Sequence, residues 1–167
     1  WPLTFDPPGQ RIYLGNDDGQ MLVIATGGGQ LEPPPLPTPL GDQVTPQQLL
    51  VAPDGTRFHL NEWRLYRSRD EGQTWQLLGA GLPGRMVNDL AISPDYERDQ
   101  TLWAGLWNFG RGGGLYRSTD GGDTWLPSTR GLTDLEIQQI AMSPTFTQDQ
   151  TVFLTTLDRG LFRTTDG

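Results

Sequence analysis

The chain has 167 residues and a formal net charge of −8, and this acidic balance argues against nucleic-acid binding, which needs a basic surface. No apolar run approaches the ~20 residues that a helix needs to cross a bilayer. Cysteine is absent and all 12 positively charged side chains are arginine, which excludes disulfides and lysine chemistry. The 22 glycines and 14 prolines indicate many turns, and a hydrophobic content of 35% is lean, as expected for thin stacked sheets.

The best-defined part of the chain reads as four short strands separated by turn residues. Runs rich in β-branched and aromatic residues cover residues 87–93, 101–106 and 114–118, and a fourth run begins at Trp125. Gly, Asp, Asn and Pro occupy the positions between these runs. Because no segment has a sustained helical period, we predict an all-β protein.

This four-strand unit is repeated along the chain. Residues 90–96 recur as residues 140–146, and weaker copies begin upstream at residues 3–9 and 49–55. The prolines that end each first strand are 46, 41 and 50 residues apart and lie at Pro7, Pro53, Pro94 and Pro144. A period of roughly 40–50 residues with several short strands per copy is typical of β-propeller blades.

An eight-residue turn, Ser-x-Asp-x-Gly-x-Thr-Trp, occurs at residues 68–75 and 118–125, and a third copy begins at residues 164–167. We expect the Asp side chain to accept backbone N–H groups two residues on, the Gly to adopt a left-handed conformation and the Trp to be buried. The corresponding place in the first copy, residues 26–31, has neither Asp nor Trp. We therefore predict a structural and not a catalytic role for Ser68, Asp70, Gly72, Thr74, Trp75, Ser118, Asp120, Gly122, Thr124, Trp125 and Asp166.

The motif resembles the Asp box, or bacterial neuraminidase repeat, of sialidases, sortilin-type receptors, some xyloglucanases and photosystem II assembly factors. The resemblance covers residues 49–167 well and residues 1–48 weakly. It implies a β-propeller with blades of four antiparallel strands in a single propeller region, and families of this kind commonly have more than four blades. The expected blades are residues 1–45 (degenerate), 46–85, 86–135 and 136–167, the last without its fourth strand.

About four blades are present, so we expect part of a larger ring. The alternative is a small four-bladed ring in which the segment at Trp1 completes the last blade. In either case the strands near residues 1–5 and 161–164 have edges that can pair with each other, with a second copy or with further blades.

One face of the predicted propeller carries the candidate binding residues. The connections between second and third strands and between blades lie on this face, whereas the Asp-box turns lie on the other. Exposed Trp and Arg are common interface anchors, although Trp63 and Trp107 could instead fill the gap between blades. The candidates on this rim are Trp63, Arg64, Arg85, Trp107, Asn108, Phe109, Arg111, Arg130, Asp158 and Arg159.

The sequence offers little support for an enzyme. The Arg-Ile-Pro string that precedes the first Asp box of sialidases is absent, and residues 11–13 are the nearest match. A xyloglucanase-type site needs two carboxylates beside a sugar cleft, and Glu62, Asp134 and Asp158 lie on the rim without a spacing that pairs them. His59, the one histidine, lies inside a predicted strand and is expected to pack. We predict no catalytic residues, no metal and no cofactor.

The sequence therefore favours a non-catalytic β-propeller scaffold or binding module for a protein or carbohydrate partner. The alternative is a glycoside hydrolase, sialidase-like or xyloglucanase-like, that acts through rim carboxylates and arginines. The resemblance to bacterial surface proteins suggests an extracellular or cell-surface location. Neither nucleic acid nor a membrane span is expected.

Overall fold

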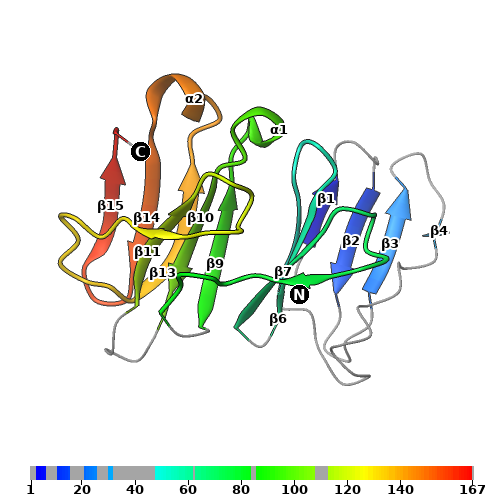
Figure 1. Cartoon of the computed structure of the whole chain (residues 1–167), viewed down its shortest axis with the longest axis horizontal. Helices are drawn as coiled ribbons and strands as arrows, with labels where there is room; N and C mark the ends of the chain where they lie inside the picture. The colour runs from blue at the N-terminus through cyan, green and yellow to red at the C-terminus, as the bar shows by residue number, and fades with distance from the viewer. Residues whose placement is uncertain are drawn as a thin grey trace. The chain divides into compact units, whose positions relative to one another are not determined.

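A computed structural model describes residues 3–6, 11–15, 21–25, 30–31, 48–61, 63–83, 86–107 and 113–166, with side chains from residue 48 on except at Asn61. The chain divides into two compact units, residues 1–78 and residues 79–167. Each unit contains two antiparallel sheets, which Figure 1 shows as groups of strands running alongside one another.

The first unit, residues 1–78, contains two four-stranded sheets with the strands in sequence order. Strand β1 of one sheet lies beside β5 of the other. The bounds are β1 Leu3–Asp6, β2 Arg11–Gly15, β3 Met21–Ala25 and β4 Gln30–Leu31, then β5 Gln48–Val51, β6 Arg57–Asn61, β7 Arg64–Ser68 and β8 Gln76–Leu77.

The second unit, residues 79–167, contains a four-stranded and a three-stranded sheet in which β9 lies beside β13. A single helical turn follows the first strand of each sheet. The bounds are β9 Val87–Ile92, α1 Tyr96–Asp99, β10 Leu102–Leu106, β11 Gly114–Ser118 and β12 Leu126–Pro127, then β13 Ile137–Met142, α2 Phe146–Asp149, β14 Val152–Thr156 and β15 Gly160–Thr164.

The all-β prediction is confirmed, because four sheets account for nearly all regular structure in the described residues. Strand β11 has the predicted bounds, while β9 ends one residue earlier than predicted and β10 begins one residue later. The last sheet has three described strands.

The two single-turn helices were not predicted, and local side-chain bonds explain them. In the first, Ser93 Oγ donates to Asp99 Oδ2 (2.6 Å) and accepts the N–H of Asp95 (3.1 Å). Gln100 then takes a left-handed conformation with φ of 49° and ends the turn. Four helical residues are too few to leave a periodic pattern in the sequence.

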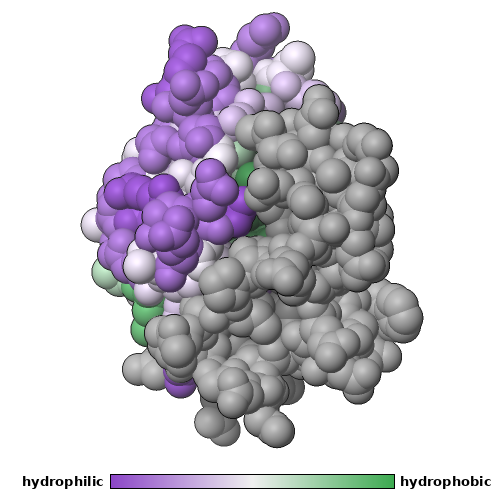
Figure 2. All heavy atoms as spheres, turned by 90° about the vertical axis from the view of Figure 1, so that its right-hand side faces the viewer, coloured by the Kyte–Doolittle hydropathy of each residue, from purple (hydrophilic) through white to green (hydrophobic). Residues whose placement is uncertain are grey.

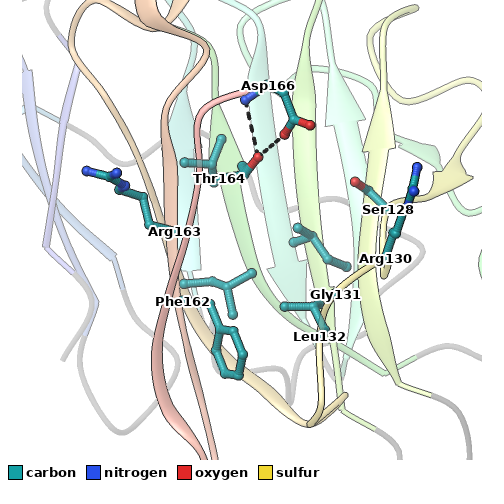
Figure 3. Close-up of a pocket in the computed structure, with 11 residues that line it drawn as sticks. Ser128, Arg130, Gly131, Leu132, Phe162, Arg163, Thr164 and Asp166 are labelled. Atoms are coloured by element: carbon teal, nitrogen blue, oxygen red, sulfur yellow. Dashed lines mark hydrogen bonds between the residues drawn. The ribbon is translucent and has the colours of Figure 1, made fainter.

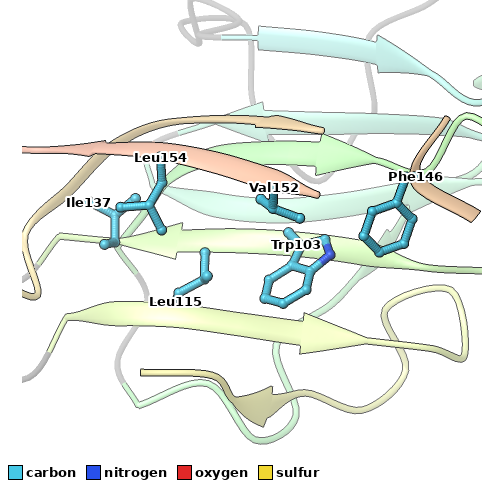
Figure 4. Close-up of a cluster of buried hydrophobic side chains, with 6 residues drawn as sticks. All are labelled: Trp103, Leu115, Ile137, Phe146, Val152 and Leu154. Atoms are coloured by element: carbon cyan, nitrogen blue, oxygen red, sulfur yellow. The ribbon is translucent and has the colours of Figure 1, made fainter. Parts of the chain in front are cut away.

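The core of the second unit lies between its two sheets (Figure 4). Trp103 and Leu115 project from the four-stranded sheet, and the opposing side chains are Ile137, Phe146, Val152 and Leu154. Gly105 permits this close approach, because a Cβ there would lie 2.5 Å from the Ile137 side chain. Burial of these apolar side chains is the main stabilising contribution between the sheets.

Hydrogen bonds also join the first strands of these two sheets. Asn88 Nδ2 donates to the carbonyl oxygens of Ile137 (3.0 Å) and Gln138 (2.9 Å). Asp89 Oδ2 accepts the N–H of Ile140 at 2.6 Å. These side chains satisfy backbone groups that would otherwise lack a partner between two separate sheets.

A smaller core in the first unit forms around Leu49, with Val51 and Trp75 packed against it. The ring of His59 meets that of Trp75 edge-on at 5.6 Å between centroids. His59 is 2% exposed, and burial lowers its pKa from 6.5 to about 4, so the ring is neutral near pH 7. The packing role predicted for His59 is therefore confirmed.

Over the face in Figure 2 the described residues are mostly hydrophilic, with small hydrophobic areas between them. Within the described part of the chain, no helix has the length and hydrophobicity to span a membrane.

Candidate functional site

The two complete eight-residue turns, called here the repeated turns (residues 68–75 and 118–125), have almost the same hydrogen bonds. In the first, Ser68 Oγ donates to Asp70 Oδ1 (2.8 Å) and accepts the N–H of Gly72 (2.8 Å). Asp70 accepts the N–H of Thr74 (2.9 Å) and its hydroxyl (2.5 Å). The indole N–H of Trp75 donates to the carbonyl oxygen of Gly72 (2.9 Å).

In the second turn, Ser118 Oγ donates to Asp120 Oδ1 (2.7 Å) and accepts the N–H of Gly122 (2.8 Å). Asp120 accepts the N–H of Thr124 (2.9 Å) and its hydroxyl (2.5 Å). The indole N–H of Trp125 donates to the carbonyl oxygen of Gly122 (3.0 Å). We predicted that the Asp side chain accepts the backbone N–H two residues further along the chain, and this is wrong. It accepts the N–H four residues further along, because the intervening N–H of Gly72 already donates to the Ser68 hydroxyl.

Two consecutive residues of each turn have left-handed backbones. They are Glu71 (φ 58°) and Gly72 (φ 93°) in the first turn, and Gly121 (φ 73°) and Gly122 (φ 97°) in the second. Glycine is the residue that adopts this conformation without steric cost. The fifth position of the motif is thus a backbone requirement.

The carboxylates of the repeated turns are held ionised. Hydrogen bonds from the Thr74 hydroxyl and N–H and from Ser68 lower the pKa of Asp70 from 3.8 to about 2. At Asp120 burial raises the pKa, but the bonds from Thr124 and Ser118 outweigh it and leave the pKa at about 2. A general acid needs a raised pKa, so these residues are suited to turn structure.

The loops at the opposite end of the second unit's sheets are joined by Asp134. Its carboxylate accepts the N–H of Glu136 (3.0 Å) and the N–H of Asp158 (2.9 Å), and these bonds lower its pKa. The N–H of Leu157 also donates to the Glu136 carbonyl oxygen (3.0 Å). Asp134 therefore ties the segment before β13 to the turn between β14 and β15.

At the same end of the sheets, backbone contacts hold the segments that follow β10 and precede β11. The N–H of Trp107 donates to the carbonyl oxygen of Met86 at 3.0 Å. A Cβ at Gly113 would lie 2.4 Å from the Leu135 carbonyl oxygen and 2.6 Å from that of Leu106, so the segments pack tightly there. We call Trp107, Asp134, Asp158 and Arg159 the loop-end residues.

The predicted rim candidates that the structure describes fall in both units. Asp158 and Arg159 are exposed in the β14–β15 turn, and Trp107 is half-buried. Trp63 and Arg64 are half-buried in the first unit, where Trp63 has a left-handed backbone with φ of 65°. Four further candidates lie outside the described residues, as does Glu62: Arg85, Asn108, Phe109 and Arg111.

Arg130 does not join the loop-end residues in the described hydrogen bonds but lines a cavity of about 370 Å³ between the two sheets of the second unit. Figure 3 shows Ser128, Arg130, Gly131 and Leu132 on one side, facing Phe162 and Thr164 of β15 on the other. The remaining lining residues are Leu115, Val152, Leu154, Arg163 and Asp166.

Neither the joining role of Asp134 nor the cavity could be predicted from the sequence. An Asp two residues before Glu136 is a local signal for an Asx-turn, but its second bond, to Asp158, depends on a residue 24 positions away. Among the described residues, no group of three or more His, Cys, Asp or Glu side chains could hold a metal ion.

No family model matches the sequence, and no curated protein matches it. Solved structures do: YCF48 bound to D1 peptide has a TM-score of 0.68 at 21% identity, covering 99% of this chain and 50% of that one. The extracellular domain of BT4673 from B. thetaiotaomicron gives 0.65 at 18%, covering 96% and 20%. XC5397 from Xanthomonas campestris, a gluconolactonase, gives 0.61 at 16%, covering 92% and 55%.

These three proteins are β-propellers, and the chain spans from a fifth to just over half of their lengths. At this identity the likeness concerns the fold and not the activity. The sheets, their antiparallel order and these similarities together establish that the chain has an all-β fold of the β-propeller class.

Proposed function

We propose that this chain is a non-catalytic β-propeller module of the Asp-box repeat type that binds a protein partner through the loop end of its second unit. The observation that carries the proposal is the bonding of Asp134, which accepts N–H groups from two separate segments. A carboxylate in this role orders the loops around it before any partner arrives. Preordered loops bind more tightly because less conformational entropy is lost on binding.

The side chains around Asp134 are suited to recognition. Arg159 and Asp158 are exposed and of opposite charge, and Trp107, the residue after β10, offers a half-buried aromatic surface. Arginine can make bidentate bonds to carboxylates or backbone carbonyls, and tryptophan is a frequent anchor of protein interfaces. Loops on a rigid sheet framework commonly carry such residues.

Two of the similar solved structures support the proposals of a protein partner and of an external location. YCF48 was solved bound to D1 peptide, and the matching part of BT4673 is an extracellular domain. The geometry of the repeated turns supports membership in the Asp-box repeat proteins, since each motif residue has a defined role in the turn. We accordingly propose an extracellular or cell-surface scaffold.

A glycoside hydrolase is the second candidate, favoured by the bond between Asp158 and the Asp134 carboxylate, which places two acidic residues together. Such enzymes need one carboxyl group with a raised pKa to act as an acid. The pKa of Asp134 is lowered and its carboxylate bonds two backbone N–H groups. This arrangement supports a structural role for Asp134 over an acid–base role.

The binding proposal can be tested with a displayed library of random linear peptides selected on the purified chain. We expect selected peptides to lose affinity about tenfold or more when Trp107 or Arg159 is replaced by Ala, because these side chains supply the anchors. Thr147→Ala, an exposed change in α2, is the matched control and should leave binding and thermal unfolding unchanged. Equal binding by all variants would contradict the proposed site.

The same protein should be assayed on sialyl and glucan substrates. We expect no release of sugar by the wild type. Turnover that Asp158→Asn or Glu62→Gln abolishes would overturn the non-catalytic proposal in favour of the hydrolase. A glycan array read with the same Trp107 and Arg159 variants separates carbohydrate binding from protein binding.

A further inference from the structure

Aspartate is followed directly by glycine at four places in the chain, residues 18–19, 54–55, 120–121 and 166–167. In such a pair the backbone nitrogen of the glycine can attack the side-chain carboxyl carbon of the aspartate, because glycine has no Cβ to obstruct the approach. Two of the pairs, Asp54–Gly55 and Asp120–Gly121, lie wholly within the described residues. The structure holds these two pairs in different ways.

Asp54 lies in the turn between β5 and β6, where its side chain is exposed. Gly55 has a left-handed backbone with φ of 85°, and a Cβ there would meet nothing within 4 Å. The N–H of Gly55 donates to the Ala52 carbonyl oxygen (2.9 Å), and the N–H of Thr56 donates to Asp54 Oδ1 (2.9 Å). Since these bonds stay within the turn, it can open without unfolding the sheet.

The other pair is held by a separate segment of the chain. The N–H of Gly121 donates to the carbonyl oxygen of Gln100, the residue after α1, at 3.0 Å, and Gly121 is buried. This bond fixes the nitrogen that would have to attack. The Asp120 carboxylate accepts bonds from the Ser118 hydroxyl and from both the N–H and the hydroxyl of Thr124. Reaction there requires the repeated turn to separate from the end of α1.

The two carboxyl groups also differ in their hydrogen bonds, which affects their reactivity. Ring closure expels a carboxyl oxygen as water, so the carboxyl group must first be protonated. At Asp120 burial raises the pKa, but the bonds from Thr124 and Ser118 leave it at about 2, so the protonated form is scarce near neutral pH. Asp54 Oδ1 accepts the Thr56 N–H, and Oδ2 accepts no hydrogen bond from the described residues.

We propose that Asp54–Gly55 is a site of spontaneous isoaspartate formation in the folded protein and that Asp120–Gly121 is protected from it. The nitrogen of Gly55 forms a bond to the carboxyl carbon of Asp54 and loses its proton, and a carboxyl oxygen leaves as water. Water then opens the cyclic imide at the main-chain carbonyl, so that the backbone runs through the former side chain. One water is lost and one is gained, and the product is an isomer of the same mass.

This modification site lies in the first unit, whereas the loop-end residues belong to the second, so the inference goes beyond the proposed function. Isoaspartate lengthens the backbone of the turn by a carbon atom and moves the carboxylate that accepts the Thr56 N–H. Strands β5 and β6 carry Leu49 and His59, which contact Trp75. We therefore expect the isomerised chain, once separated by chromatography, to unfold at a lower temperature than the unmodified chain.

The first experiment incubates the folded chain near neutral pH, below its unfolding temperature. Isoaspartate is detected with an isoaspartate-specific carboxyl methyltransferase and labelled S-adenosylmethionine, and electron-transfer fragmentation in a mass spectrometer assigns it to a residue. We expect isoaspartate to form at least about tenfold faster at Asp54 than at Asp120, because the exposed turn opens at a lower free energy. Equal rates at the two residues in the folded chain would overturn the proposal.

The second experiment repeats the incubation in concentrated urea, where both pairs lose their native hydrogen bonds. The two rates should then agree within about threefold, because only the local sequence remains to distinguish them. A preference for Asp54 that persists unchanged in urea would assign it to the sequence and overturn the proposal. Formation at Asp54 in urea but not in the folded chain would show that the turn protects this pair, and would also overturn it.

Asp54→Ser is the matched control variant. Its hydroxyl can still accept the Thr56 N–H, but it has no carboxyl group to close the ring. The methylation assigned to residue 54 should be lost in this variant, and the rate at Asp120 should stay the same. Methylation that persists in the peptide around residue 54 would place the reaction at another residue and contradict the proposal. None of these outcomes bears on the peptide-binding experiment, because its variants change other residues.

Discussion

The two sheets of the second unit carry the same repeat and have nearly the same local geometry. Just before α1 and α2, the Ser93 and Ser143 hydroxyls donate to Asp99 and Asp149, the last residues of these turns, in both cases at 2.6 Å. The two helical turns end at glutamines with the same φ of 49°. These bonds join residues six positions apart, so a repeated sequence reproduces them in each copy.

Burial differs sharply between the same two sheets. Leu115 on β11 is 3% exposed, whereas Leu161 at the corresponding position of β15 is 67% exposed. All five residues of β10 are buried, whereas burial alternates along β14. Local conformation therefore follows the repeat, and burial follows whatever is packed beside each sheet.

The largest expected effect contrasts Trp103 with its counterpart Phe153. Trp103 is fully buried in the core between the sheets, so Trp103→Ala should lower the free energy of unfolding by about 3–5 kcal/mol. Phe153→Ala should cost clearly less, because that side chain is only half-buried. Urea denaturation measures both losses of unfolding free energy, given that the dependence on urea concentration is the same for each variant. Equal losses would show that burial does not distinguish the two sheets.

A smaller effect is expected from the repeated turn of the four-stranded sheet. Asp120→Ala leaves the N–H and hydroxyl of Thr124 without their acceptor and should cost about 1 kcal/mol, since solvent reaches this turn. Asp120→Asn keeps one oxygen and should cost less. Asp166→Ala, in the third copy, should change stability least. An unchanged denaturation midpoint for Asp120→Ala would contradict the structural role of the turn.

Acid should weaken both repeated turns in a defined range. Because the pKa of Asp70 and of Asp120 falls from 3.8 to about 2 on folding, each carboxylate stabilises the fold fully above about pH 4. That contribution is lost as the pH falls from about 4 towards 2. In the double variant Asp70→Asn and Asp120→Asn, thermal unfolding should depend less on pH over this interval. An undiminished dependence would assign the acid sensitivity to other carboxylates.

The smallest effect on stability is expected at Leu161, the exposed counterpart of Leu115. Leu161→Ser should change the free energy of unfolding by no more than about 0.5 kcal/mol, because the side chain is 67% exposed. Leu115→Ser, its buried counterpart, should be strongly destabilising. A large loss for Leu161→Ser in thermal unfolding would mean that something covers β15 in solution.

Much of the fold could be predicted from the sequence because its signals are local. The bounds of β11 and the positions of the repeated turns come from runs of residues and from a motif of eight consecutive positions. Features of the candidate site that join distant segments could not be predicted in this way. The exposure of Asp158 and Arg159 agrees with their loop positions, whereas Arg130 lines a cavity that no local pattern reveals.

The sequence by itself determined the repeat, the strands and the repeated turns, since each turn closes hydrogen bonds between residues at most four positions apart. Only the tertiary structure decided the Asp134 bond to Asp158, the Asn88 bond to Ile137 and the cavity beside β15. These join residues 24 and 49 positions apart, or walls from two sheets. Local bonds need only neighbouring residues in the right order, whereas such contacts exist only once whole sheets are packed together.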